Sequence, residues 1–574
     1  MNYLLNRKSI ICCITFLFCF LFLFPPRFQK DLAFATQAPS LSLEETISRR
    51  LSTRDYTSEN ISSQQLLEVL CAAYGHNNSY RSIPEIGYNY PLIIFPVNET
   101  GSYQYIPENN SLVVYDLTVN KETIHNDFPS YNSWVTSANV ILVIVWNQSE
   151  ASNQYFASAE AGCLVQNVYL AAASLDLGTC CVGGIDSSGL SSHLKLPSSL
   201  IPLLVMPLGY PVISYPPASP NYDFMTGNLP PVQYSTLSFE DALKNMLFAQ
   251  NWSARNLSTH ELSQLFWASY GYTNITHDSS YHRTTPSSRG IYPLVIFVSN
   301  ATGVYQYLPE NHSVKEIVQG DRRFEIANVS SGQLWATNAP AIFLVVYNSA
   351  YNGGNTGDGG VVEHLAIEVD AGAVVQELFL EASAWNLSTN IISQGLEDWN
   401  GTGANELRNI LGLSSSYIPL YLVTVGSRIQ DMTLPQIGIP SQNPEPTAVG
   451  PYQNVTVTVN VVDNETGIRE VILSYTIDEG QTWINITMKK ISNDTYREEI
   501  PGFEADTHVQ YQIIAYDNAN NIAINNNNNE YYVYTVITEF QLSVILIFMT
   551  TILITVIFAK KKKRFFFQQC RIKQ

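Results

Sequence analysis

Two arginines and a serine stand close together near the start of the chain, in the order Arg50-x-Ser52-x-Arg54. They directly precede a stretch at 63–74 whose apolar residues recur at helical spacing. Guanidinium groups offer forked N–H donors and the serine hydroxyl adds another, so this cluster has the chemistry to hold an anion such as a phosphate. A solvated charged turn explains the same three residues, and the cluster alone does not decide between the two interpretations.

The elements that must position this cluster occur twice in the chain. The stretch "NISSQQLLEVLCAAYG" (60–75) aligns with "NLSTHELSQLFWASYG" (256–271), and the Tyr/Pro-rich stretch at 90–112 aligns with 292–314. Such self-similarity at a long spacing is the signature of a repeated domain. A serine stands at the predicted N-cap of the helix in both copies, so each helix has a defined start.

Each copy combines a capped helix, short apolar β runs and one long apolar helix, which predicts an α+β domain. We place the copies at 40–211 and 237–428, with a Pro/Tyr-rich linker at 212–236. After a second linker at 429–446, residues 447–537 alternate apolar and polar positions with frequent turn residues. This pattern predicts a β-sandwich, and it resembles the immunoglobulin-like or fibronectin-like modules of cell surfaces.

Both ends of the chain indicate export to a membrane. A cationic start, an apolar stretch and the small-residue site Ala33-Phe34-Ala35 predict a cleaved signal peptide over 1–35, with an uncleaved anchor as the alternative. Residues 540–559 are mostly apolar and long enough for a transmembrane helix, and the tail at 560–574 is basic. We therefore expect a single-pass protein of the cell membrane, anchored at its C-terminus, with its body outside the cytoplasm.

Composition excludes several classes of function. The net charge is −19 and no basic stripe lies outside the two ends, so we expect no nucleic-acid partner. Many Asn-x-Ser/Thr sequons agree with an exported, glycosylated surface. No zinc spacing, His-Glu-x-x-His motif or P-loop is present, and no metal site is expected. The cysteines of the body are too few for a disulfide framework, although a bridge between Cys71 and Cys163 stays open.

The order of motifs in the two copies resembles the nitroreductase family of FMN flavoproteins, in particular its SagB-type peptide azoline dehydrogenases. The first copy has "RRLSTRDYTSENISSQQLLEVLCAAYG", "YQYIPENNSL", "AEAGCLVQNVYLAAASLDLG" and "CVGGID". In that family Arg-x-Ser-x-Arg/Lys binds the FMN phosphate. A Pro-Ser-x-Gly-like turn lies against the isoalloxazine, and a Gly-Gly-Phe/Ile-Asp-like turn touches the ring near N5. The resemblance therefore implies FMN as the cofactor.

The two copies keep different parts of this family site. The first keeps the Arg-x-Ser-x-Arg cluster and the turn Gly183-Gly184-Ile185-Asp186, but its Pro-Ser turn has become Pro84-Glu85-Ile86-Gly87. The second keeps Pro286-Ser287-Ser288 but has Met246, Phe248 and Gln250 at the arginine and serine positions. The chain therefore retains one set of each part.

Family members are homodimers whose flavin sites take the phosphate grip from one subunit and the Pro-Ser turn from the other. The surviving parts thus belong to opposite sides of one site. We predict that the two repeats pair within the chain as a pseudo-dimer and hold a single FMN, while the second site is lost. The predicted cofactor-binding residues are Arg50, Ser52, Arg54, Gly183, Gly184, Pro286, Ser287 and Ser288.

The chain departs from the SagB pattern in two places. It lacks the Lys-Tyr pair that precedes the long helix, and the first copy ends in "LGYPVISYPP" without the usual basic residues. No catalytic residue is assigned, and Glu160 and Asp186 are interpreted as capping or surface residues. Two functions follow: an extracytoplasmic, membrane-anchored FMN oxidoreductase acting on a small molecule or a modified peptide, or a non-catalytic surface protein that uses the pseudo-dimer as a scaffold.

Overall fold

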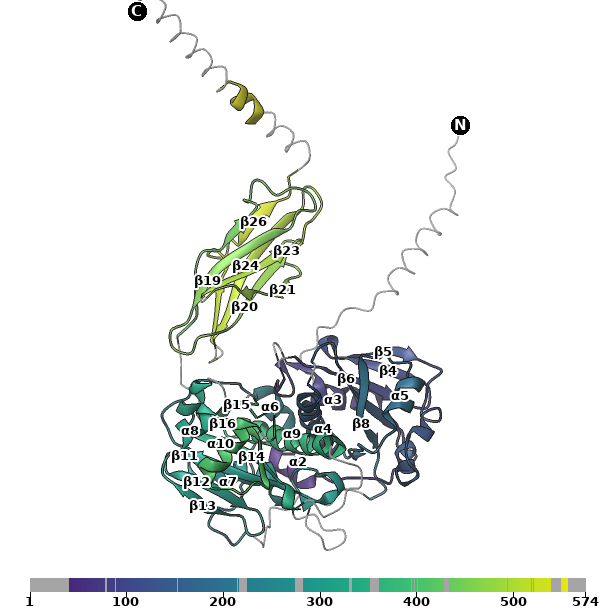
Figure 1. Cartoon of the computed structure of the whole chain (residues 1–574). Helices are drawn as coiled ribbons and strands as arrows, with labels where there is room; N and C mark the ends of the chain where they lie inside the picture. The colour runs from purple at the N-terminus through teal and green to yellow at the C-terminus, as the bar shows by residue number, and fades with distance from the viewer. Residues whose placement is uncertain are drawn as a thin grey trace, which may run out of the picture.

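The computed structural model describes residues 41–537, apart from short internal gaps, and a further stretch at 549–555. The gaps are 78–79, 88, 152, 214, 216–224, 274–281, 330–332, 352–360, 394, 397, 400, 428–432, 493, 518 and 520. The predicted signal peptide at 1–35 and the predicted basic tail at 560–574 lie outside the described residues. Two sheet-and-helix domains lie side by side, and a β-sandwich stands apart from them (Figure 1).

The first repeat is built on a six-stranded antiparallel sheet with the order β5-β4-β3-β6-β8-β7. Its strands are β3 (Leu92–Val97), β4 (Ser102–Ile106), β5 (Ser111–Asp116), β6 (Val140–Asn147), β7 (Gly178–Thr179) and β8 (Leu200–Gly209), with a small hairpin β1 (His76–Asn77) and β2 (Tyr80–Arg81). Its helices are α2 (Leu43–Arg49), α3 (Ser63–Tyr74), α4 (Gln154–Ser174) and α5 (Ser187–His193), with 3-10 turns η1 (Pro107–Asn109), η2 (His125–Asp127) and η3 (Ser130–Ser137).

The second repeat has the same sheet order, β13-β12-β11-β14-β16-β15. Its strands are β11 (Leu294–Asn300), β12 (Gly303–Leu308), β13 (Ser313–Gln319), β14 (Ala341–Asn348), β15 (Leu387–Ile392) and β16 (Tyr417–Ser427), with a hairpin β9 (Tyr272–Thr273) and β10 (His282–Arg283). Its helices are α6 (Phe239–Asn245), α7 (Thr259–Tyr270), α8 (Arg323–Asn328), α9 (Val361–Ala384) and α10 (Thr402–Leu411), with 3-10 turns η4 (Ser288–Gly290), η5 (Leu334–Asn338) and η6 (Ser349–Tyr351).

The two repeats share details as well as topology. The ladder between the fourth and fifth strands of each sheet shifts register at the same place, between Ile144 and Val145 in one copy and between Val345 and Val346 in the other. The serines predicted as N-caps begin α3 and α7, and both form complete capping boxes. The prediction of two tandem α+β copies is confirmed.

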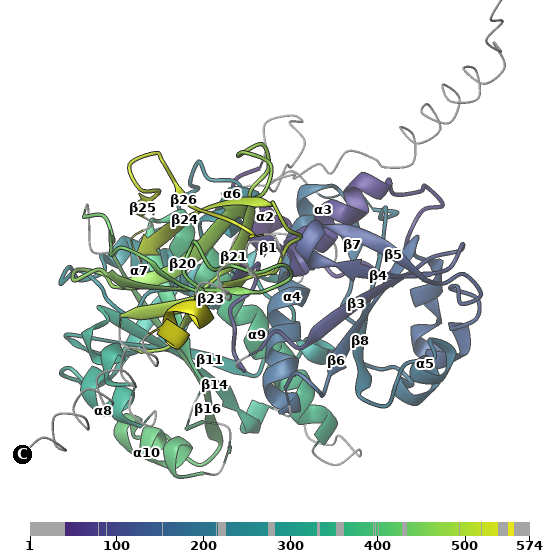
Figure 2. The same cartoon turned by 90° about the horizontal axis from the view of Figure 1, so that it is seen from above.

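The long helices α4 and α9 pack against each other between the two sheets, as Figure 2 shows from above. Glycines make this close approach available, because a Cβ on Gly162 would lie 2.1 Å from the Val369 carbonyl oxygen and one on Gly372 would lie 1.9 Å from that of Ala159. Cys163 donates from its thiol to the Gly372 carbonyl at 3.1 Å and is a free cysteine, as Cys71 is, so the two form no bridge. One hydrophobic core runs through both repeats.

The C-terminal region consists of two antiparallel sheets around a core of its own. One sheet contains β17 (Gln436–Ile437), β18 (Ser441–Asn443), β19 (Val455–Val462), β22 (Lys489–Lys490) and β23 (Thr495–Ile500). The other contains β20 (Ile468–Thr476), β21 (Ile484–Thr487), β24 (His508–Asp517), β25 (Ile522–Asn525) and β26 (Tyr532–Thr535). Alternate valines of β19 point into the core, which explains the period-two pattern. The kinship with immunoglobulin-like or fibronectin-like modules stays a prediction.

The transmembrane helix predicted over 540–559 needs correction. In the part of the chain that the structure describes, no helix is long and apolar enough to cross a membrane. The described helical stretch in this region covers only 549–555. The rest of the predicted span lies outside the described residues.

Candidate functional site

Arg50 connects the first repeat to the second. It directly follows α2, its side chain is buried, and its Nε and Nη2 donate to the carbonyl oxygen of Arg283 at 3.1 and 3.0 Å. Its guanidinium carbon lies 5.1 Å from the ring centre of Tyr169, which is a cation–π distance. Among the described residues its Nη1 finds no partner. A buried guanidinium with an unused N–H group is suited to an acceptor that the chain itself does not supply.

Ser52 and Arg54 continue the cluster along the edge of the first sheet. Ser52 forms an isolated parallel bridge with Thr179, and its hydroxyl lies 2.9 Å from that of Tyr169, which also accepts from the Cys181 N–H. Arg54 is exposed and its guanidinium carbon lies 5.9 Å from the Trp134 ring centre. The cluster therefore runs beside the chain that leads from β7 to the glycine turn.

The turn at Gly183 and Gly184 is open on one side. A Cβ placed on Gly183 would meet nothing within 4 Å, and this residue is exposed. The carbonyl of Gly184 accepts from Asn132 at 2.9 Å, and Asp186 caps α5 by accepting from the backbone of Gly189, as its capping interpretation predicted. The turn is thus fixed from behind and leaves room in front of Gly183.

The Pro286-Ser287-Ser288 turn of the second repeat is held by Asp370 of α9. Asp370 accepts from the Ser287 hydroxyl at 2.7 Å and from the Ser288 N–H at 3.0 Å. Burial raises the pKa of Asp370 to about 7, although these hydrogen bonds oppose the shift. Asp370 also contributes to the raised pKa of Cys181, whose main cause is burial, and this cysteine shortly precedes the glycine turn of the other repeat.

The structure brings one predicted site residue of the first repeat, Arg50, to the segment of the second repeat that leads to Pro286. The phosphate-grip residue Arg50 bonds to Arg283, which lies three residues before Pro286. Asp370, which fixes the Ser287 turn, lies near enough to Cys181 to affect its titration. Arg54 lies beside η3, where its guanidinium carbon is near the ring of Trp134.

The corresponding seam on the other side is filled by the chain's own residues. Met246 is buried, and the ring of Phe248 lies 5.5 Å from that of Phe379, which aligns with Tyr169. Phe248 forms the same parallel bridge, to Thr389, that Ser52 forms in the first repeat. The apolar side chains of Met246 and Phe248 therefore replace the hydrogen-bond donors of Arg50 and Ser52, while the parallel backbone bridge is kept.

Residues of the second repeat that follow β15 also fill this second seam. Ser393, which begins the segment in place of the glycine turn, donates to the Ile86 carbonyl at 3.0 Å. Trp399 stacks on His364 with 3.7 Å between ring centres and donates to Glu368 at 3.2 Å. The seam is thus packed with aromatic and polar groups that satisfy one another.

Sequence reasoning missed the role of two buried carboxylates. Glu160 is fully buried, so its interpretation as a surface or capping residue is wrong, and it accepts from the N–H groups of Ile86 and Gly87 at 2.9 and 3.1 Å. Asp370 holds the equivalent turn of the other repeat. The signal was present in the alignment of the long helices, where these two acids occupy the same position. A carboxylate kept inside an apolar helix needs partners.

These buried acids predict a pH-dependent stability. Burial raises the pKa of Glu160 to about 8 and those of Glu368 and Asp370 to about 7, so the folded chain retains protons that the unfolded chain releases near pH 4 to 4.5. Their contribution is fully present at low pH and is lost as the pH rises through the folded values. We expect the free energy of unfolding to fall by roughly 3 kcal/mol between pH 6.5 and 8.5.

Chemical unfolding followed by fluorescence at both pH values measures this change. His312 does not titrate in this pH range, because burial lowers its pKa to about 4. Glu160→Gln removes the group with the highest of the three values and should flatten the profile. A stability that is constant or increases toward pH 8.5 contradicts the prediction.

The comparisons with known proteins agree with this architecture. The family model described as "Nitroreductase family" matches residues 47–210 and 251–427, together more than half of the chain. The chain therefore belongs to the nitroreductase family, and the family domain occurs in it twice. A curated protein of Methanocaldococcus jannaschii whose name places it among the nitroreductases is 33% identical over 185 residues, covering 29% of this chain and 91% of its own length.

One solved structure shows the same fold over most of the chain. A protein from Anabaena variabilis described as a nitroreductase matches with a TM-score of 0.52 at 16% identity, covering 70% of this chain and 94% of its own. Because 70% of this chain exceeds one repeat, that match extends over both repeats. A nitroreductase from Desulfovibrio desulfuricans, solved in complex with FMN, is 21% identical with a TM-score of 0.24, covering 34% of this chain and 99% of its own.

Proposed function

We propose that this chain is an FMN-dependent oxidoreductase of the nitroreductase family with one composite flavin site, formed where Arg50 of the first repeat meets the 283–288 segment of the second. The contact between Arg50 and the Arg283 carbonyl carries the proposal, because it joins the retained half-site of one repeat to the retained half-site of the other. The filled second seam supports a stoichiometry of one flavin per chain.

The donor set around the seam fits a phosphate group. Arg54 is exposed, Ser52 is half-buried, and Arg50 has one N–H group without a partner among the described residues. Guanidinium and hydroxyl donors of this kind form charge-assisted hydrogen bonds to phosphate oxygens. We expect Arg50 to bind the phosphate only modestly, because its Nε and Nη2 already donate to the Arg283 carbonyl.

The two turns fit the faces and edge of a planar ring. Gly183 has no side chain and open space before it, which allows a close approach of a ligand. Pro286, Ser287 and Ser288 approach from the other repeat and are held by Asp370. When bound, FMN supplies hydride transfer itself, so the chain's own residues need only bind it, orient it and exclude water.

We propose the substrate only by its chemical class. A small oxidised molecule or a modified peptide agrees with the SagB-like order of motifs, whereas the missing Lys-Tyr pair argues against azoline oxidation. The alternative function, a non-catalytic scaffold for a partner at the cell surface, is favoured by one observation: Arg50 is only 2% exposed. We also propose, from the N-terminal sequence and the sequons, that the body of the chain works outside the cytoplasm.

The decisive experiment is anaerobic reduction of the FMN-loaded full chain by NADH or NADPH, followed by reoxidation with a nitroaromatic compound. Free FMN at the same concentration corrects for background reduction. An oxidoreductase is expected to turn over well above this background. Flavin that binds but is never reduced, or a chain that takes up no flavin at all, would instead favour the scaffold.

A further inference from the structure

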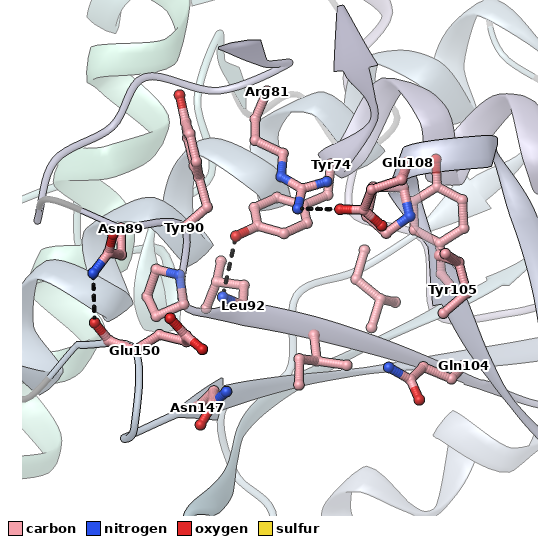
Figure 3. Close-up of a pocket in the computed structure, with 15 residues that line it drawn as sticks. Tyr74, Arg81, Asn89, Tyr90, Leu92, Gln104, Tyr105, Glu108, Asn147 and Glu150 are labelled. Atoms are coloured by element: carbon pink, nitrogen blue, oxygen red, sulfur yellow. Dashed lines mark hydrogen bonds and ion pairs between the residues drawn. The ribbon is translucent and has the colours of Figure 1, made fainter. Parts of the chain in front are cut away.

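A second site lies in the first repeat, away from the seam. A cavity of about 410 Å³ opens above the beginning of β3, between the end of α3 and the turn that follows β6 (Figure 3). Tyr74, Tyr90 and Tyr105 form aromatic walls, and Leu92 and Ile94 belong to its apolar floor. This volume lies within the range of sites that bind small molecules.

Among the described residues that line the cavity, the cation is Arg81, which is paired with a carboxylate although its buried Nη1 has no hydrogen-bond partner. Arg81 donates to Glu108 at 2.9 Å, and its guanidinium carbon lies 4.8 Å from the ring centre of Tyr74 and 5.9 Å from that of Tyr90. Figure 3 shows the guanidinium between these rings and the carboxylate. The aromatic faces that attract cations are thus taken by Arg81, so they offer no free cage to a second cation.

The remaining polar lining is mostly neutral. Asn89, Gln104 and Asn147 bring side-chain amides to the cavity, and Glu150 brings a carboxylate. In the described part of the chain, the Gln104 amide and the Glu150 carboxylate form no hydrogen bond. Amides both donate and accept, as hydroxyl groups do. With Arg81 paired to Glu108, Glu150 leaves the lining with an excess of negative charge, which disfavours phosphates and carboxylates.

The second repeat differs from the first in the residues that correspond to this cavity. The corresponding arginine, Arg283, donates to the Tyr270 carbonyl at 2.9 Å and lies 4.5 Å from the ring centres of Tyr270 and Tyr272. Its side chain is buried, and Tyr351 stands where the first repeat has Glu150. The corresponding arginine is therefore more deeply buried in the second repeat than in the first.

We propose that the cavity of the first repeat binds a neutral, hydroxyl-rich ring, namely a monosaccharide or the terminal sugar of a glycan. Tyr90, which is half-buried, offers part of its ring to the C–H face of a sugar, whereas Tyr74 and Tyr105 are almost fully buried beneath the cavity. The Gln104 amide and the Glu150 carboxylate offer the mixed donors and acceptors that neighbouring hydroxyl groups require, while Asn89 already donates to the Glu150 carbonyl and Asn147 accepts from the Ser149 N–H. This site is independent of the flavin proposal, since it contains none of the seam residues.

Saturation-transfer NMR on the full chain tests the site with glucose, galactose, mannose and N-acetylglucosamine, each free and as the terminal unit of a short oligosaccharide. We expect at least one of these sugars to bind, with Gln104→Leu and Glu150→Ala each weakening it about tenfold, since a lost hydrogen-bond partner leaves its counterpart unpaired. Stronger binding of the oligosaccharide would identify a glycan end as the natural source, and equal binding a free sugar.

Gln306→Leu, the same change in the second repeat, is the matched control and should leave binding unchanged. Methyl phosphate and tetramethylammonium serve as charged probes of similar size. Preferential binding of either charged probe overturns the proposal, as does sugar binding that survives both first-repeat variants or the absence of binding by every sugar. Far-UV circular dichroism of each variant shows that the fold is intact.

Discussion

Arg54→Ala is expected to weaken FMN binding by roughly tenfold to a hundredfold, because it removes an exposed guanidinium that would form charge-assisted hydrogen bonds to the phosphate. The parent chain is expected to bind one FMN. Quenching of FMN fluorescence during titration with the full chain measures both affinity and stoichiometry. Because Arg54 makes only a distant contact with the Trp134 ring, the substitution should leave thermal stability nearly unchanged.

Gln250→Ala is the matched control, since Gln250 occupies the position of Arg54 in the second repeat. It should bind FMN like the parent. Two FMN molecules per chain, or equal losses from the two substitutions, would show that the second seam is still a site. Unchanged FMN affinity in Arg54→Ala would show that Arg54 of the first repeat does not bind the FMN phosphate.

Gly372→Val is expected to destabilise the paired repeats by roughly 3 kcal/mol, or to prevent their folding. A Cβ at this position would lie 1.9 Å from the backbone oxygen of Ala159, so α4 and α9 would have to move apart. The core is common to both repeats, and we therefore expect the loss to affect both of them together. Urea unfolding monitored by tryptophan fluorescence measures the change.

Gly183→Ala is the control for adding a side chain to a glycine. Its Cβ would meet nothing within 4 Å, so the free energy of unfolding should change by less than about 0.5 kcal/mol. The same variant should bind FMN more weakly if the ring approaches this turn. A loss of stability in Gly183→Ala equal to that in Gly372→Val would show that the crossing of the helices is not specially tight.

Much of the fold follows from local pattern. The capping serines Ser62 and Ser258 define where α3 and α7 begin, and the alignment of the two copies predicts that both adopt one topology. These features depend on residues that are near one another in the chain. The transmembrane helix predicted over 540–559 from hydropathy is not found, since no helix among the described residues is long and apolar enough to cross a membrane.

The candidate site was predictable only in part. Family motifs pointed to Arg50 and to Ser287, but the bond from Arg50 to the Arg283 carbonyl joins the two repeats, and no single stretch of sequence encodes how the repeats pack. The stacking of Trp399 on His364 joins residues far apart in sequence whose types suggest no partner. Carboxylates such as Asp370 are usually exposed, so only the packed structure reveals that one is buried.

The joining of both repeats in one chain has an evolutionary consequence. In a homodimer a single gene encodes both subunits, so every substitution enters both flavin sites at once. A change such as Met246 in place of the arginine would then have damaged both sites at a stroke. After duplication and fusion, the positions of Arg50 and Met246 became separate targets of selection. Fusion of the two repeats therefore allows one seam to be filled while the other keeps its arginines.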